Sequence, residues 1–260
     1  MKKLERLKNL LEGKSNFKKN ASEYTPQTKE DLETIVNDLI KKYGNKVDLN
    51  IIDVSNIDDF SELFFKLTKF NGDVSLWNVS NGRQFDSIFF ECNAFNGDLS
   101  NWDVFNGTDF SFMFTECYKF NSDVSKWDVS NGESFREIFN GCRIFNSDVS
   151  KWNVSNADDL QSMFSGCKKF NSNLSKWDVS NVTSFGWMFA DCIIFNSDLS
   201  KWDVSNGENF EYMFFNCKSF NANLSNWYIS EYADYEGFAE GSLLAKYPKR
   251  LPARIRGEEN

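Results

Sequence analysis

The chain of 260 residues carries a formal net charge of −9 and contains 41% hydrophobic residues, a content that excludes a disordered chain. It has no histidine, which closes the commonest Ser-His-Asp, Cys-His and zincin chemistries. It also has no GxGxxG, P-loop or GxSxG motif, and nothing singles out a carboxylate pair among its 38 acidic residues. We therefore expect that the protein is not an enzyme and has no catalytic residue, metal site or cofactor.

Residues 1–20 are a basic N-terminal segment with a net charge of +5. Its leucines, Leu4, Leu7, Leu10 and Leu11, fall on one helical face. This pattern predicts an amphipathic helix that docks on the protein itself, with docking on a membrane or a partner as the alternatives. We find no apolar run of the signal-peptide or transmembrane kind and no lipobox, so we expect a cytoplasmic location, with the cell surface as the alternative.

Residues 21–44 are predicted to be a helical cap. Thr28 and Asp31 form a capping box after Pro26, and the helix should end near Gly44. The inward face is predicted to consist of Leu32, Ile35, Val36, Leu39 and Ile40. Such a helix would cover the open edge of the segment that follows.

Residues 45–244 repeat with a period of 25 residues, which gives about eight units. The period is carried by three columns: Trp77, Trp102, Trp127, Trp152, Trp177, Trp202 and Trp227; Phe70, Phe95, Phe120, Phe145, Phe170, Phe195 and Phe220; and Cys92, Cys117, Cys142, Cys167, Cys192 and Cys217. One unit cannot bury its apolar side chains alone, so we expect the units to stack as a repeat solenoid.

Within a unit, Trp202 and Val204 alternate as in a short strand with one buried face. The following apolar residues, Phe210, Met213, Phe214 and Cys217, have spacings of 3, 4 and 7, which predict a short helix or helical turns pointing inward. The expected fold is therefore a leucine-rich-repeat-like solenoid of short parallel strands, about 4.8 Å apart, and short helical segments, with the N-terminal helical cap.

The units FNSDVSKWDVSN (Phe120 to Asn131) and MFSGCKKF (Met163 to Phe170) resemble those of the BspA-like leucine-rich repeat proteins. The form is the one rich in Phe-Asn and Trp-Asp-Val that is common in mycoplasmas and other AT-rich bacteria. The resemblance covers roughly residues 28–244. It implies a leucine-rich-repeat solenoid that is used for protein contacts, often on cell surfaces.

Residues 245–260 are predicted to be a basic, irregular C-terminal tail, which could form a partial cap. Residues 241–260 together carry a charge of +3, which leaves −17 for residues 21–240. This acidic body disfavours direct binding to nucleic acid and predicts a protein partner with a basic surface.

Three polar or reactive columns are better explained by structure than by chemistry. The six cysteines occur once per unit without any C-x-x-C pair, so we expect buried, reduced thiols; disulfides or a metal ladder are the alternative. Asparagines such as Asn106 and Asn131 should satisfy backbone groups at turns. Glycosylation-type patterns such as Asn78-Val-Ser80 and Asn181-Val-Thr183 arise from the repeat. The aspartate column lacks any calcium-loop pattern.

The candidate binding residues are aromatic side chains at outward positions where other units carry polar residues. Phe105 stands where its neighbours have Ser, and two outward columns contain the other candidates. The candidates are Phe105, Phe112, Trp187, Tyr212 and Phe215. Exposed aromatics among polar residues are typical of protein-binding hot spots, and packing against a cap or a neighbouring molecule is the alternative.

These observations favour a non-enzymatic protein-binding scaffold with a rigid acidic surface and a few aromatic anchors. A second hypothesis is an intracellular inhibitor, of a kind that a mobile element could encode, that blocks the basic nucleic-acid groove of an enzyme. A third is a bacterial surface adhesin. The sequence leaves the oligomeric state and the partner open.

Overall fold

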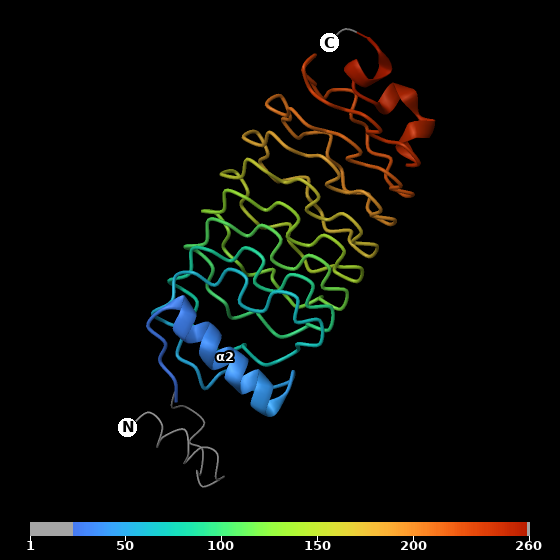
Figure 1. The fold of residues 1–260 in the computed structure, drawn as a ribbon. Coiled ribbons are helices and arrows are strands. Elements are labelled where there is room, and N and C mark those ends of the chain that lie inside the picture. Colours follow the sequence, from blue (N-terminus) through green and yellow to red (C-terminus); the bar gives the residue numbers. More distant parts are fainter. Residues whose placement is uncertain (1–22, 259–260) are drawn as a thin grey trace.

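The computed structural model describes residues 23–258. The chain winds into a stack of coils, with helix α2 (Lys29–Tyr43) lying across one end and the C-terminal turns at the other (Figure 1). The predicted basic segment at residues 1–20 and the last two residues of the tail lie outside the described residues. Within residues 23–258, no helix is long and apolar enough to cross a membrane.

Helix α2 begins after Thr28, whose side chain accepts a hydrogen bond from the Asp31 N–H at 3.2 Å. It ends where the Gly44 N–H donates to the Ile40 carbonyl at 2.8 Å, with φ of 87° at Gly44. Its buried side chains are Leu32, Val36 and Leu39. They pack against the apolar core of the first coil, so the helix covers apolar surface that would otherwise face water.

Successive coils pair in parallel through isolated bridges between residues 25 apart, except for Tyr24 with Ile52 at the N-terminal end. The bridges of the stack are Asp48–Asp73, Asp59–Gln84, Gln84–Asp109, Asp109–Ser134, Ser134–Asp159, Asp159–Ser184, Ser184–Asn209 and Asn209–Asp234. After each Gln84-type residue, alternate N–H groups donate along the stack axis. In one coil the N–H groups of Phe85, Ser87, Phe89 and Glu91 bond the carbonyls of Asp109, Ser111, Met113 and Thr115 at 2.7–3.0 Å.

The predicted helical segment is instead a series of tight turns at residues 85–92 and their equivalents, which we call the turn ribbon. The Ile88 N–H bonds the Phe85 carbonyl at 3.4 Å, and φ is positive at Ser87 (56°) and Glu91 (55°). In an α-helix each N–H group would donate to the carbonyl four residues earlier in the chain. Here alternate N–H groups donate instead to carbonyls of the next coil. The left-handed residues interrupt right-handed coiling, so this segment consists of turns and not of the short helix that the spacing also allowed.

The predicted strand around each Trp and Val is also a run of turns. The Trp77 N–H bonds the Val74 carbonyl at 3.2 Å, and the Gly82 N–H bonds the Val79 carbonyl at 2.8 Å. Aspartate side chains satisfy further N–H groups locally, as Asp73 does for Ser75 at 3.0 Å. These N–H groups are therefore not available for a ladder, although the Trp and Val side chains are buried as the alternation predicts.

The core consists of side-chain ladders that run along the stack. Trp77 and Trp102 have ring centroids 6.4 Å apart and nearly parallel planes. Each ladder Trp donates its indole N–H to a carbonyl of the preceding coil, as Trp127 does to Leu99 at 3.0 Å. The six cysteines are free and buried, and the Cys92 thiol donates to the Phe64 carbonyl at 3.0 Å. Burial raises the pKa of Cys92 to about 12.

The C-terminal residues form three 3₁₀ turns, η1 (Leu244–Lys246), η2 (Pro248–Arg250) and η3 (Arg254–Arg256). They bond back to an earlier coil: Arg250 Nη1 donates to the Asn221 carbonyl at 2.8 Å, and the Leu224 N–H donates to the Arg250 carbonyl at 2.7 Å. Leu244 is fully buried. Residues 245–258, expected as a tail, thus cover the second end of the stack.

Candidate protein-binding surface

The structure brings three of the five candidate side chains together on the turn ribbon. Trp187 and Tyr212 stack with ring centroids 4.4 Å apart, and Phe215 lies 6.0 Å from Trp187 and 5.7 Å from Tyr212. All three are half-buried. We call Trp187, Tyr212 and Phe215 the C-terminal aromatic cluster. Its members lie in adjacent coils, so the contact arises from the stacking of repeats.

A second group contains Phe112 and two residues that the sequence analysis did not select, Phe65 and Phe90. Phe65 and Phe90 stack at 4.9 Å, and Phe90 meets Phe112 edge-on at 6.5 Å. We call these three residues the N-terminal aromatic cluster. Phe65 and Phe90 stand 150 and 125 residues before Phe215 in the same 25-residue column, a signal that could have found them.

The polar residues of the same two columns separate the clusters. They are Glu137, Asn140, Ser162 and Ser165, and the Asn140 amide donates to Glu137 at 2.8 Å. Phe112 and Trp187 are three coils apart, which at about 4.8 Å per coil places the clusters about 14 Å apart along the stack. A partner that spans both clusters would have to cover this polar strip.

The N-terminal aromatic cluster already carries cations of this chain. Lys66 Nζ lies 5.0 Å from the Phe65 ring centroid and 5.8 Å from that of Phe90, and it pairs with Glu91 at 3.7 Å. The Arg136 guanidinium lies 5.9 Å from the Phe112 ring. These cation–π contacts occupy part of the ring surface.

The C-terminal aromatic cluster lies instead among carboxylates. The Tyr212 hydroxyl donates to Glu236 at 3.1 Å. This hydrogen bond, and the negative charges of Glu236, Glu240 and Glu211, raise the pKa of Tyr212. The ring surface is therefore in a region of negative potential.

Three of the aromatic residues occupy left-handed backbone positions. The φ angles are 59° at Phe112, 60° at Trp187 and 51° at Tyr212, and the next residue of the column is Gly237 with 60°. This conformation is natural for glycine and disfavours bulky side chains, by about 1–2 kcal/mol per residue. The rings are thus held on the surface at an energetic cost.

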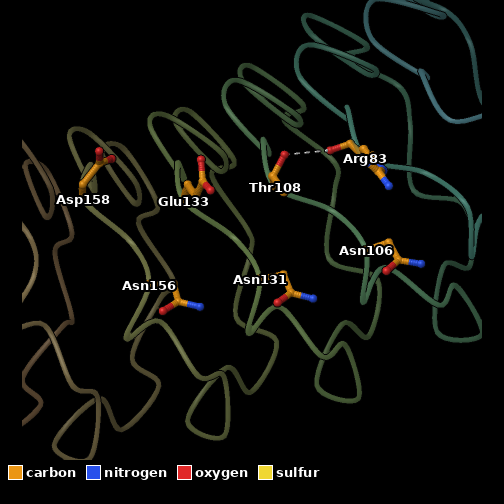
Figure 2. A pocket seen from close by; sticks show the side chains of 7 residues that line it. All are labelled: Arg83, Asn106, Thr108, Asn131, Glu133, Asn156 and Asp158. Carbon is orange, nitrogen blue, oxygen red and sulfur yellow. Dashed lines mark hydrogen bonds between the residues drawn. The ribbon is translucent and has the colours of Figure 1, made fainter.

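Phe105 joins neither cluster. Its side chain is 46% exposed, and its carbonyl accepts the side-chain amide of Asn131 at 2.8 Å. Asn131 lines an open polar groove of about 610 Å³ with Arg83, Asn106, Thr108, Glu133, Asn156 and Asp158. Figure 2 shows the three asparagines in one row and the other four residues in a second row.

The asparagines of the groove serve the backbone. Asn106 donates to the Ser80 carbonyl and Asn156 to the Ser130 carbonyl, each at 2.7 Å, so their amides are already engaged. Within residues 23–258, no group of three or more Cys, Asp or Glu residues could hold a metal ion. The charged groups of the groove are the carboxylates of Glu133 and Asp158 and the guanidinium of Arg83.

The stacked 25-residue coils and the repeated core columns define a tandem-repeat protein. The chain belongs to the family described as "Mycoplasma protein of unknown function, DUF285", whose family model matches residues 30–150 and 133–246. A search of curated proteins finds no match. The family membership places the chain in a mycoplasma repeat family and assigns it no activity.

Proposed function

We propose that this protein is a non-enzymatic protein-binding scaffold, a leucine-rich-repeat-like solenoid related to the BspA-like proteins. The observation that carries the proposal is the C-terminal aromatic cluster. Trp187, Tyr212 and Phe215 gather on one surface, half-exposed, and two of them occupy backbone positions that penalise bulky side chains. Trp and Tyr side chains are enriched in binding hot spots.

The stack would present this surface rigidly. Each turn ribbon is tied to the next by four axial backbone hydrogen bonds, and Trp, Phe and Cys ladders fill the interior. A preorganised surface loses little conformational entropy when a partner binds. The acidic body would steer a partner with a basic surface toward it.

Affinity capture with matched variants tests the scaffold proposal. Immobilised wild-type protein, Trp187→Asn and Tyr232→Asn would be exposed to a lysate of the source cells. Asn tolerates the left-handed backbone of position 187, and Tyr232 is an 89% exposed aromatic outside both clusters. We expect a partner that the wild type and Tyr232→Asn retain and Trp187→Asn loses. Equal capture by all three proteins would overturn the proposal.

A second candidate function is inhibition of an enzyme by occupation of its basic nucleic-acid groove. The observation in its favour is a column of exposed carboxylates along the stack, Asp103, Asp128, Asp178 and Asp203. None of these four forms an ion pair within the described part of the chain. Asp103 and Asp128 lie one coil apart, about 4.8 Å, as do Asp178 and Asp203, whereas Asn153 interrupts the column between Asp128 and Asp178. The spacing within each pair is of the same order as the charge spacing of about 3.4 Å along one DNA strand.

Competition distinguishes this candidate from the scaffold. An inhibitor of a nucleic-acid groove should be displaced by the nucleic acid and should bind far more weakly as salt rises. Replacement of Asp128 and Asp178 by Asn should weaken it, whereas Trp187→Asn should not. Binding that is insensitive to nucleic acid and to salt would reject this candidate.

A further inference from the structure

The two aromatic clusters differ in one respect that points to a ligand. In the N-terminal aromatic cluster, cations of the chain itself lie near the rings, and carboxylates pair with those cations. The C-terminal aromatic cluster has rings and carboxylates, but no cation of the described residues lies over its rings. The inference from this difference rests on the proposed scaffold function.

We propose that the C-terminal aromatic cluster binds a Lys or Arg side chain of a basic protein segment. The cation would lie against the Trp187 ring, because Trp187 and Gly237 already contact the Tyr212 ring from the two neighbouring coils. The negative charges of Glu211, Glu236 and Glu240 would attract it to this part of the surface. The indole ring of Trp offers the strongest cation–π attraction of the aromatic side chains. A carboxylate beside the ring adds a charge-assisted hydrogen bond to the same cation.

The chain shows this three-part arrangement twice at the N-terminal aromatic cluster. Lys66 lies near Phe65 and Phe90 and pairs with Glu91 at 3.7 Å. The guanidinium of Arg136 lies 5.9 Å from the Phe112 ring, and its Nη1 is 3.5 Å from Asp159. Ring, cation and carboxylate therefore fit together on this turn ribbon, and the same geometry is incomplete at the C-terminal aromatic cluster.

Lys218, three residues after Phe215, is already engaged. Lys218 Nζ donates to Asn216 Oδ1 and to the Gly241 carbonyl, each at 2.9 Å. Asn216 in turn donates to Asp191 at 3.1 Å. These bonds engage the Lys218 ammonium, and Lys218 is in none of the cation–π contacts of the described residues.

The surrounding charge selects a cation over other side chains. The Tyr212 hydroxyl feels the charges of Glu211, Glu236 and Glu240, all of which raise its pKa. A partner carboxylate would be repelled here, and an apolar side chain would cover the ring edges while leaving the carboxylates without a counter-charge. A basic side chain satisfies the rings and the carboxylates together.

Trp187 provides a spectroscopic reporter for this site. The other seven Trp side chains, Trp77, Trp102, Trp127, Trp152, Trp177, Trp202 and Trp227, are only 3–5% exposed, whereas Trp187 is half-buried. A change in quencher-accessible tryptophan fluorescence during a titration therefore reports on position 187. The probe would be a penta-arginine peptide, with penta-citrulline as a neutral control of the same shape.

The experiment titrates each peptide into wild type, Glu236→Gln, Trp187→Asn and Phe90→Ser at about 0.15 M ionic strength. Fluorescence follows the variants that keep Trp187, and calorimetry follows all four proteins. We expect saturable penta-arginine binding, no penta-citrulline binding, and affinity about fivefold weaker for Glu236→Gln and about tenfold weaker for Trp187→Asn. Phe90→Ser, in the other cluster, should bind as the wild type does.

Equal affinity of Trp187→Asn and wild type for penta-arginine would overturn the proposal, because the attraction would then belong to the acidic body alone. If Trp187→Asn nevertheless loses its captured partner, the scaffold function stands and only the cation proposal fails. Loss of both supports both proposals.

Discussion

Trp187 and Tyr212 stack at 4.4 Å across adjacent coils while both adopt left-handed backbone conformations, with φ of 60° and 51°. At positions 187 and 212, any residue other than glycine raises the free energy of the folded state by adopting this conformation. The contact between the two stacked rings offsets part of this unfavourable free energy. The backbone conformation therefore favours glycine at these two positions, whereas the proposed binding needs aromatic rings there.

Replacement of Trp187 by Gly should destabilise the protein only moderately and abolish partner binding. Relief of the left-handed backbone, about 1–2 kcal/mol, offsets the lost ring contact with Tyr212, about 0.5–1.5 kcal/mol, and leaves the loss of the half-buried apolar area, about 1.5–2.5 kcal/mol. Urea unfolding should give a free energy about 1–2.5 kcal/mol below that of the wild type. The buried control Phe164→Ala should lose about 3–5 kcal/mol. A loss at Trp187→Gly as large as the control's would contradict the assignment of the ring to binding.

Gly237→Ala should destabilise the protein and displace the Tyr212 ring. Gly237 has φ of 60°, and a Cβ there would overlap the Tyr212 ring. We expect a loss of about 1–3 kcal/mol. Adding Tyr212→Ala should recover the part caused by overlap but not the part caused by the backbone, so the two changes should be non-additive in a double-mutant cycle. Full additivity would show that the ring and the glycine are independent.

Trp127→Phe should be destabilising despite keeping an aromatic ring. The indole N–H donates to the Leu99 carbonyl in the buried core, and the ring stacks on Trp152 at 6.2 Å. Phe leaves that bond unmade and leaves unfilled volume, which together cost about 2–4 kcal/mol. Chemical denaturation measures the loss. Tyr228→Phe, at an exposed position one residue after a ladder Trp, serves as the control and should be neutral.

The free energy of unfolding should fall steeply above about pH 9. Burial raises the pKa of all six thiols, to about 12 at Cys92, whereas an unfolded thiol ionises near 9. Above pH 9 the unfolded state therefore loses protons that the folded state keeps, and each thiol costs about 1.4 kcal/mol per pH unit. Urea unfolding from pH 8 to 10 measures the slope. Cys142→Ser should reduce it by about one proton, and an unchanged slope would refute the assignment to thiols.

The aspartate turns should contribute stability that is lost in acid. Hydrogen bonds from the Ser150 side chain and N–H lower the pKa of Asp148. Hydrogen bonds from Ser125 lower the pKa of Asp123 in the same way. A lowered folded-state pKa gives stability that is present above the unfolded value near 3.8 and is lost as pH falls through the folded value. Asp148→Asn keeps the acceptor, as Asn173 does for Ser175 at 3.1 Å. It should therefore flatten the acid limb of a thermal unfolding profile without preventing folding.

Much of the architecture could be predicted from the sequence because packing imposes a strict period. The 25-residue columns identify the buried Trp, Phe and Cys side chains, and the capping box locates helix α2. Both features depend on residue type and spacing alone. The resemblance to repeat families follows from the same columns, which explains why it identifies the mycoplasma repeat family without indicating a function.

The backbone conformation of each unit could not be predicted in this way. Apolar spacings of 3, 4 and 7 suit a helix, but they also suit consecutive turns with a left-handed residue at every fourth position, such as Ser87 and Glu91. The choice depends on where the N–H groups bond. The turn ribbon forms because carbonyls of the neighbouring coil accept hydrogen bonds from alternate N–H groups, and this contact exists only in the stacked structure.

The candidate binding residues, too, could be predicted from the sequence only in part. The sequence by itself determined that Phe112, Trp187, Tyr212 and Phe215 are exceptions in outward columns, because a residue that packing does not require stands out against its repeats. Only the tertiary structure decided that they form two clusters, that Phe65 and Phe90 belong to one of them, and that Phe105 lies apart. The reason is physical: side chains 25 residues apart meet only after the coils have stacked, and stacking also decides which rings lie beside a cation and which lie among carboxylates.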